Sequence, residues 1–317
     1  MTSERHIRHT WAPERPITIA AGTPPGGGLD RVAHALAGVI TEARLLDVPV
    51  NVVNIPGDGA RRVWAEVDRY VGDAHLVSIS SPNLTTDHLV GLAVFDHSRY
   101  VPIATLVTEY IAFAVRADSA LRTGADLLHR LAADPGNVTV ALSTALGNPN
   151  HIAFAKLTRH AGGDINAPRI RVFDTALDAV VDVVEGHAEL SAVTAASVVK
   201  ELEAGRVRLL AISAPLRLPA PFAAVPTWTE QSVDCVIGAW RGITGPSGID
   251  APQITFWERL LAGVVRDHRW QAALARHCWS PMHLDGPSLH AYLVQEGAQM
   301  RALLDELGLL QPKHDQP

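Results

Sequence analysis

Cysteine, clustered positive charge and long apolar runs are all scarce in this sequence. Its 317 residues include only two cysteines, Cys235 and Cys278, which form no metal-type pair and provide no disulfide framework. The formal net charge is −6, and no segment is rich in lysine and arginine, so the basic footprint of a nucleic-acid or membrane-surface protein is missing. Charges interrupt each apolar stretch before about 18 residues, which argues against direct insertion into a membrane.

Catalytic, metal and nucleotide motifs are also missing. The 15 histidines form no H-x-x-x-H or H-E-x-x-H pair with a carboxylate partner on a helix, so we predict no metal site. No serine lies in a G-x-S-x-G elbow, and we predict no catalytic residue. The one prominent Gly-rich loop lacks the lysine of a Walker loop and the spacing of G-x-G-x-x-G, so no nucleotide cofactor is expected.

The composition is that of a globular protein, with 47% hydrophobic and 19% charged residues. At 317 residues the chain is long enough for two domains of about 150 residues each. An acidic protein that binds an anion must do so through local groups.

The segment PPGGGLD, residues 24–30, is the most informative stretch. It follows the apolar run 17–21 and precedes residues 32–40, whose apolar positions share one helical face. A strand, a Gly-rich loop and a helix N-terminus together point free N–H groups at an anion. We therefore predict a carboxylate site with the following loop residues: Pro25, Gly26, Gly27, Gly28 and Asp30. An ordinary strand-to-helix turn with Asp30 as a capping residue is the alternative.

The same order recurs downstream. A second strand over 48–54 leads into the loop 55–59 and a helix over 62–70, and a third strand over 75–80 leads into the polar loop 81–86. Alternating strands and helices indicate a parallel sheet, whose ligands bind beyond the carboxyl ends of the strands. Ser81 and Asn83 are therefore predicted to line the same crevice.

A second α/β unit begins near residue 111. Strands are predicted over 111–115 and 138–142, with a helix over 124–133 between them. The loop 143–150 then leads into a helix that starts near His151, which repeats the logic of the first loop. We predict that this loop holds the other side of the ligand through Thr144, Gly147, Asn148 and His151, although packing is the commoner role for a buried histidine.

The remaining elements complete both units. The sequence predicts strands over 169–173, 190–193, 207–212 and 236–242, a helix over 176–185, a Pro-rich surface stretch over 215–226 and three amphipathic helical segments from about 251 onward.

Several motifs occur in an order that resembles a known family. Between residue 16 and the end, the chain is similar to the substrate-binding receptors of tripartite tricarboxylate transporters, the Bug family of solute-binding proteins. The resemblance rests on segments PPGGGLD (24–30), NIPGDG (54–59), Gly147 with His151, EGH (185–187), VPTWTE (225–230), WRG (240–242) and GPSG (245–248).

The resemblance implies a two-domain, periplasmic-binding-protein-like (type II) α/β fold with a ligand cleft between the domains. Residues 16–108 plus 229–317 would form the first domain and residues 109–228 the second. A small organic acid would be held by backbone N–H groups and water from the two Gly-rich loops. The membrane subunits of a tripartite transporter are the implied partners.

This chain departs from the family at residues 173–175, where Phe-Asp-Thr replaces the usual Tyr-Lys-Gly. If Asp174 faces the cleft, its charge repels a second carboxylate, so Asp174 is a predicted ligand-binding residue.

Two observations point to different cellular compartments for this protein. The resemblance implies a periplasmic or extracytoplasmic receptor, whereas residues 1–15 are polar and show no secretory signal. An intracellular enzyme or ligand sensor that retains the same carboxylate-binding cleft is therefore the alternative function, with a cytoplasmic location.

Overall fold

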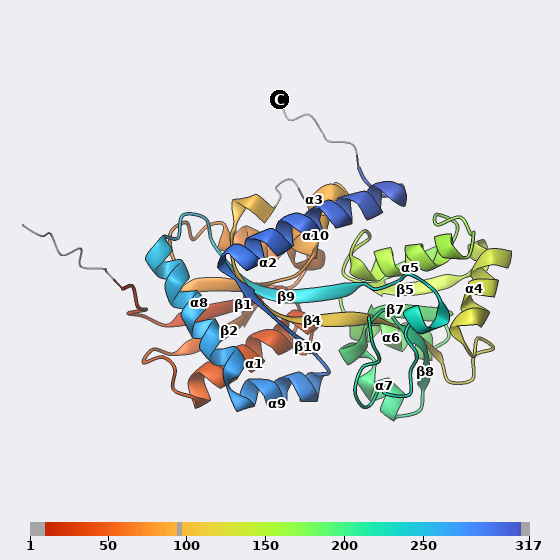
Figure 1. The fold of residues 1–317 in the computed structure, drawn as a ribbon, viewed down its shortest axis with the longest axis horizontal. Coiled ribbons are helices and arrows are strands. Elements are labelled where there is room, and N and C mark those ends of the chain that lie inside the picture. Colours follow the sequence, from red (N-terminus) through yellow and green to blue (C-terminus); the bar gives the residue numbers. More distant parts are fainter. Residues whose placement is uncertain (1–9, 94–96, 312–317) are drawn as a thin grey trace, which may run out of the picture.

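A computed structural model describes residues 10–93 and 97–311 (Figure 1). Most of the polar N-terminal segment considered above, residues 1–9, lies outside the described residues. The fold is a mixed sheet covered by helices, with long central strands that pass from one half of the molecule into the other (Figure 1).

The sheet follows the order β2-β1-β3-β9-β4-β7-β5-β6, with β10 and β8 also pairing with β4. Its strands are β1 (Ile17–Ala21), β2 (Val50–Asn54), β3 (Leu76–Ser80), β4 (Val101–Arg116), β5 (Thr139–Ser143), β6 (Arg169–Phe173), β7 (Leu190–Thr194), β8 (Val207–Ile212), β9 (Gly238–Gly245) and β10 (Ser280–Asp285).

The α-helices cover both faces and both ends of this sheet (Figure 1). They are α1 (Gly28–Glu42), α2 (Arg61–Val67), α3 (Asn83–Leu89), α4 (Gly124–Ala133), α5 (Pro149–His160), α6 (Ala176–Val184), α7 (Val199–Glu203), α8 (Ala251–Arg266), α9 (His268–His277) and α10 (Gly286–Glu306).

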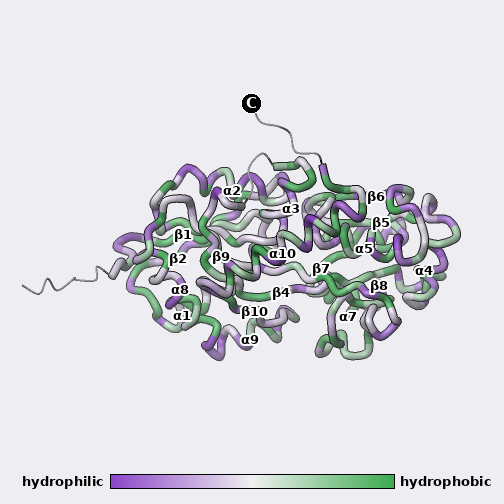
Figure 2. The backbone as a smooth tube through the Cα atoms, turned by 45° about the horizontal axis from the view of Figure 1, so that its top comes forward, coloured by the Kyte–Doolittle hydropathy of each residue, from purple (hydrophilic) through white to green (hydrophobic). Residues whose placement is uncertain are grey.

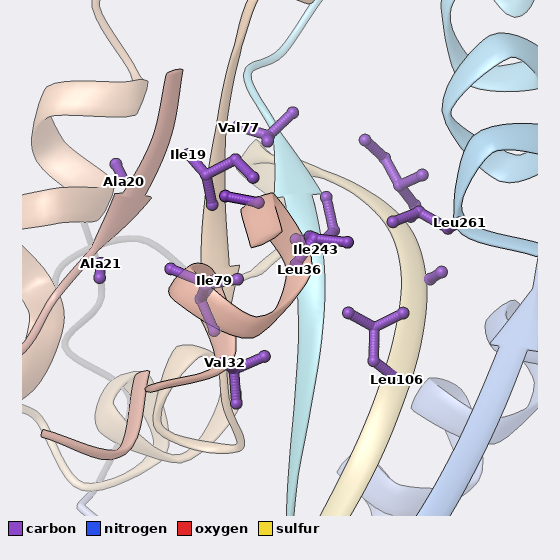
Figure 3. Close-up of a cluster of buried hydrophobic side chains, with 14 of the residues drawn as sticks. Ile19, Ala20, Ala21, Val32, Leu36, Val77, Ile79, Leu106, Ile243 and Leu261 are labelled. Atoms are coloured by element: carbon purple, nitrogen blue, oxygen red, sulfur yellow. The ribbon is translucent and has the colours of Figure 1, made fainter. Parts of the chain in front are cut away.

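The molecule has two lobes. We call the part built on β1, β2 and β3 the first lobe, and the part built on β5, β6, β7 and β8 the second lobe. In the first lobe, Ile19, Val77 and Ile79 from the strands meet Leu36 of α1 and Leu261 of α8, and all five side chains are fully buried (Figure 3). This burial is the dominant favourable contribution to folding because it removes apolar surface from water.

The second lobe has its own apolar clusters. Phe113 packs edge-on against Trp228, and both are fully buried among side chains of β5, α4 and α5. A further cluster lies under α6 and includes Phe222. Apolar stretches of the backbone run through the interior of both lobes, while hydrophilic stretches gather at their outer edges (Figure 2).

Long elements join the lobes. Strand β4 pairs with β9 and β10 through its first half and with β7 and β8 through its second half. Helix α10 lies across both lobes (Figure 1): Leu289 and Leu293 pack on Trp240, whereas Met300 and Leu304 belong to the core of the second lobe. Residues 233–239, which the sequence assigns to the first domain, also pack in the core of the second lobe. The predicted domain boundaries stay a prediction.

The sheet differs in part from the predicted parallel one. Strands β1, β2 and β3 are parallel, as are β5, β6 and β7, but every pair made by β4 is antiparallel. The run 111–115 is only the second half of a 16-residue strand. Its first half was missed because Pro102 and polar residues interrupt the apolar pattern.

Two further elements were not expected. Helix α3 occupies much of the predicted polar loop 81–86, and β10 separates α9 from α10. Short segments with mixed polarity carry weak periodicity, so their structure depends on the packing around them. Within the described ranges, each helix is too short or too polar to cross a bilayer.

Candidate functional site

A cleft lies between the lobes and is partly open to solvent. Helices α1, α5 and α6 begin at its wall, so three sets of helix N-terminal N–H groups approach one cavity. The wall consists of Gly22, Thr23, Pro24, Gly27, Gly28, Leu29, Gly57, Gly59, Ala60, Ser81, Asn83, Ser143, Thr144, Asn148, Pro149, Asn150, Asp174, Thr175, Ala176, Thr194, Ser197, Ala239 and Arg241.

Asp30 organises the first Gly-rich loop from behind. Its carboxylate, 5% exposed, accepts hydrogen bonds from the Gly26 N–H at 2.8 Å and from Asn54 Nδ2 at 2.8 Å. The Asp30 N–H donates to Thr23 Oγ1 at 3.1 Å. Asp30 makes no side-chain cap to its own helix, so it acts as a loop organiser.

Each glycine of this loop has a different role. Gly26 has a φ of +82°, which a residue with a side chain rarely adopts. Gly27 has a φ of −69°, its N–H donates to Pro24 O at 2.9 Å, and an added Cβ would lie 2.5 Å from Thr23 Cβ. The Gly27 N–H therefore closes the turn, and contact between Gly27 and a ligand stays a prediction.

The N–H groups of Gly28 and Leu29 are the donors that this loop leaves available. Neither donates to any of the described residues. A Cβ added to Gly28 would lie 3.7 Å from Arg241 Nη2. Arg241 thus places a guanidinium beside the start of α1, where an anion is already favoured.

Arg241 is held by a buried carboxylate. Its Nη2 and Nε lie 2.8 Å and 3.0 Å from Glu109 Oε2, and the Glu109 side chain is 1% exposed. The Trp279 Nε1–H donates to Glu109 Oε1 at 3.2 Å. These contacts fix the orientation of the guanidinium because Glu109 and Arg241 lie on the long strands β4 and β9.

The second Gly-rich loop has a matching design. The Gly147 N–H donates to His151 Nδ1 at 2.9 Å, and Gly147 has a φ of +76°. His151 is 3% exposed, and burial lowers its pKa from 6.5 to about 4, so the ring is neutral and accepts this bond.

Asn148 ends this loop as the N-cap of α5. Its Oδ1 accepts from the His151 N–H at 3.1 Å, and its Nδ2 donates to Thr144 Oγ1 at 2.8 Å. Asn83 of the first lobe donates to the same Thr144 hydroxyl at 3.3 Å, which is a polar contact across the cleft. The Asn150 N–H has no acceptor in the part of the chain that is described.

Asp174 lies between β6 and α6. Thr175 is the N-cap of α6 and accepts from the Asp178 N–H at 3.1 Å. The Asp174 side chain is exposed and lines the cleft.

The structure separates the predicted ligand-binding residues into two groups. Those that line the cleft are Gly27, Gly28, Ser81, Asn83, Thr144, Asn148 and Asp174. Pro25, Gly26, Asp30, Gly147 and His151 are not part of that wall, and their contact with a ligand stays a prediction. Asp30 and His151 accept hydrogen bonds from the N–H groups of Gly26 and Gly147, as a loop that must satisfy its own N–H groups requires.

Sequence analysis missed several residues of the wall. Arg241 was noted within a motif but not assigned to the site, and Asn150, Thr194 and Ser197 were also left out. A Trp-Arg-Gly triplet has no spacing signal for ligand binding. Arg241 reaches the cleft only because antiparallel pairing places β9 between β3 and β4.

Together, the two-lobed α/β fold and the cleft define a periplasmic-binding-protein-like solute receptor of the type II class. A family model described as the tripartite tricarboxylate transporter family receptor matches residues 36–309. This chain belongs to that family.

Known relatives support this assignment. The chain is 24% identical to protein BugT of Bordetella pertussis, over 93% of this chain and 90% of BugT. MatC of Rhodopseudomonas palustris with bound malate has a TM-score of 0.81 at 19% identity, over 92% of this chain and 100% of MatC. A second R. palustris protein, solved with adipate, has a TM-score of 0.85 at 20% identity, over 93% of this chain and 98% of its own.

Proposed function

We propose that this protein captures a small organic carboxylate in the cleft and delivers it to the membrane subunits of a tripartite transporter. The observation that carries this proposal is the pair of available N–H groups at Gly28 and Leu29 beside the Arg241 guanidinium. Backbone donors and a fixed cation at one helix N-terminus suit a carboxylate, because each oxygen accepts more than one hydrogen bond.

Capture also requires two walls. Residues 16–108 plus 229–317 would form one domain and residues 109–228 the other, with β4 and β9 as the connections between them. The Asn83–Thr144 bond shows that side chains from opposite walls are within reach of each other. A ligand that bridges the walls would stabilise the closed arrangement by its own binding free energy.

The titratable groups of the site do not favour the alternative of an enzyme. His151 is buried outside the cleft wall and uses Nδ1 to accept from the Gly147 N–H, so it is not placed for acid–base chemistry on a ligand in the cleft. The family assignment favours a receptor that works outside the cytoplasmic membrane. Cell fractionation of the native host, with an antibody against this chain, would check the compartment.

The test of carboxylate capture uses two glycines of one helix. In Gly28→Ala, the new Cβ has room beside Arg241 but stands where the carboxylate approaches the N–H groups. Losing one charge-assisted hydrogen bond, at about 1.5–3 kcal/mol, lowers affinity roughly 10- to 150-fold. Calorimetric titration with succinate, adipate and their monocarboxylate analogues measures the change.

Gly38→Ala is the matched control, because Gly38 lies in α1 with no neighbouring atom within 4 Å of the added Cβ. This variant should bind as the wild type does. Equal affinities of Gly28→Ala and Gly38→Ala, with both proteins folded, would place the carboxylate elsewhere.

A further inference from the structure

Only two charged side chains belong to the cleft wall within residues 10–93 and 97–311: Arg241 and Asp174. The charge of Arg241 is balanced by Glu109, whose carboxylate lies 2.8 Å from Nη2. Asp174 has no such partner among the described residues, and its side chain is exposed. The wall therefore carries one uncompensated negative charge.

Charges immediately behind the wall do not alter this balance. Arg31 lies beside Glu109, with Nη2 4.0 Å from Oε1, and its Nη1 donates to Gly26 O at 3.0 Å. The Asp30 carboxylate, which holds the Gly26 N–H, carries the opposite charge. These two residues carry opposite charges, so Asp174 remains the one charged side chain of the wall without a charged partner among the described residues.

The two charged positions also lie on different walls. Arg241 is beside Gly28 on the β9 and α1 side, whereas Asp174 follows β6 in the second lobe. We propose, on the basis of the proposed function, that Asp174 selects ligands with a carboxylate at one end and an amino group at the other. A ligand of this class would place its carboxylate at Gly28 and its ammonium group at Asp174.

The physical argument is electrostatic. A dicarboxylate would bring a second negative charge to Asp174, where like charges repel, and no described cation of the wall is left to compensate it. An ammonium group would instead form a charge-assisted hydrogen bond with the carboxylate. Specificity of this kind combines one attractive contact with one repulsive contact, so the preference should be larger than either contact alone provides.

The experiment compares three ligands of equal chain length: 4-aminobutanoate, butanoate and succinate. A second set of 6-aminohexanoate, hexanoate and adipate covers the longer span. Calorimetric titrations contain EDTA, so that no divalent cation bridges two carboxylates. For wild-type protein, the amino acid should bind at least about tenfold more tightly than the dicarboxylate in one of the two sets.

Asp174→Asn should reverse this order, because it removes the charge and retains the size of the side chain. The affinity for the amino acid should fall about tenfold, and that for the dicarboxylate should rise. Asp234→Asn is the control with the same change in net charge, since Asp234 is 97% exposed and lies outside the cleft wall. It should leave all six affinities unchanged.

The outcomes separate this inference from the proposed function. Tighter binding of the dicarboxylates to wild-type protein, or equal effects of Asp174→Asn and Asp234→Asn, would overturn the selectivity while leaving carboxylate capture in place. Absence of binding by all six compounds would overturn both.

Discussion

The two Gly-rich loops of the cleft reach the same geometry with different chemistry. In each, a glycine with positive φ donates its N–H to a side chain four residues later: Gly26 to Asp30 and Gly147 to His151. The first organiser is a buried carboxylate, and the second is a buried neutral imidazole.

This difference has two consequences. Asp30 places a negative charge behind the loop that is proposed to bind the anion, and Arg31, whose Nη1 donates to Gly26 O at 3.0 Å, brings the opposite charge to the same loop. The second loop carries no such charge. Its stability depends instead on a group that titrates in mildly acidic solution, because the imidazole can accept from Gly147 only while it is unprotonated.

The largest expected effect is that of Asp30→Ala. The change removes the acceptor of the Gly26 N–H and of Asn54 Nδ2, two charge-assisted bonds worth about 1.5–3 kcal/mol each. The free energy of unfolding should therefore fall by about 3–6 kcal/mol, measured by urea denaturation. Asp30→Asn should lose less, since an amide oxygen still accepts. A loss below about 1 kcal/mol for Asp30→Ala would mean that the loop is held by other contacts.

Acid should weaken the second loop through His151. Its pKa falls from 6.5 to about 4 on folding, so protonation favours the unfolded chain. The wild type should lose about 1.4 kcal/mol per pH unit relative to His151→Gln as the pH falls from 6.5 towards 4. Denaturation of both proteins at several pH values gives the difference.

Other buried acids do not affect that comparison. Burial raises the pKa of Asp87 to about 6 and that of Glu296 to about 7. Their effect on stability is opposite to that of His151, because the folded protein loses their contribution as the pH rises. Both proteins contain them, so their contributions cancel. A difference that does not change with pH would contradict the assignment of a neutral, buried His151.

Alanine at the two positive-φ glycines should cost unequal amounts. Both replacements adopt a disfavoured conformation, at about 1–2 kcal/mol. At Gly26 an added Cβ has no atom within 4 Å, whereas at Gly147 it would lie 2.4 Å from Val90 Cγ1. Gly147→Ala should therefore lose about 1–3 kcal/mol more than Gly26→Ala. Gly147→Ala in a Val90→Ala background should recover that excess, and melting temperatures of the three proteins would show it.

The smallest expected effects come from single hydrogen bonds at the first turns of α1 and α5. Thr23→Val retains the shape of the side chain but removes the acceptor of the Asp30 N–H, at about 1 kcal/mol. Asn148→Ala removes the N-cap of α5 and should cost about the same. If the Thr23 variant were as stable as the wild type, Asp30 would be positioned by Gly26 and Asn54 alone. Chemical denaturation has the precision for this test.

Much of the fold is predictable from local patterns. Strand-loop-helix order was recognised around residues 24–30 and 143–151 because apolar periodicity, glycines and polar caps act within a few residues of one another. The parallel strands of each lobe and helices α4, α5 and α6 follow the same rule, with boundaries shifted by one or two residues. Family membership was likewise predictable from the order of short motifs, and the family match confirms it.

The cleft was only partly predictable, because its charges come from residues far apart in the chain. Glu109 and Arg241 are 132 positions apart and meet through the antiparallel pairing of β4 with β9. The sequence alone determined where N–H groups would be exposed, since that depends on neighbouring residues. Neighbouring residues also decided which of them remain available, because the side chains of Asp30 and His151 accept hydrogen bonds from Gly26 and Gly147, four positions earlier. Tertiary structure decided the charge of the site, since electrostatic balance depends on distances in space.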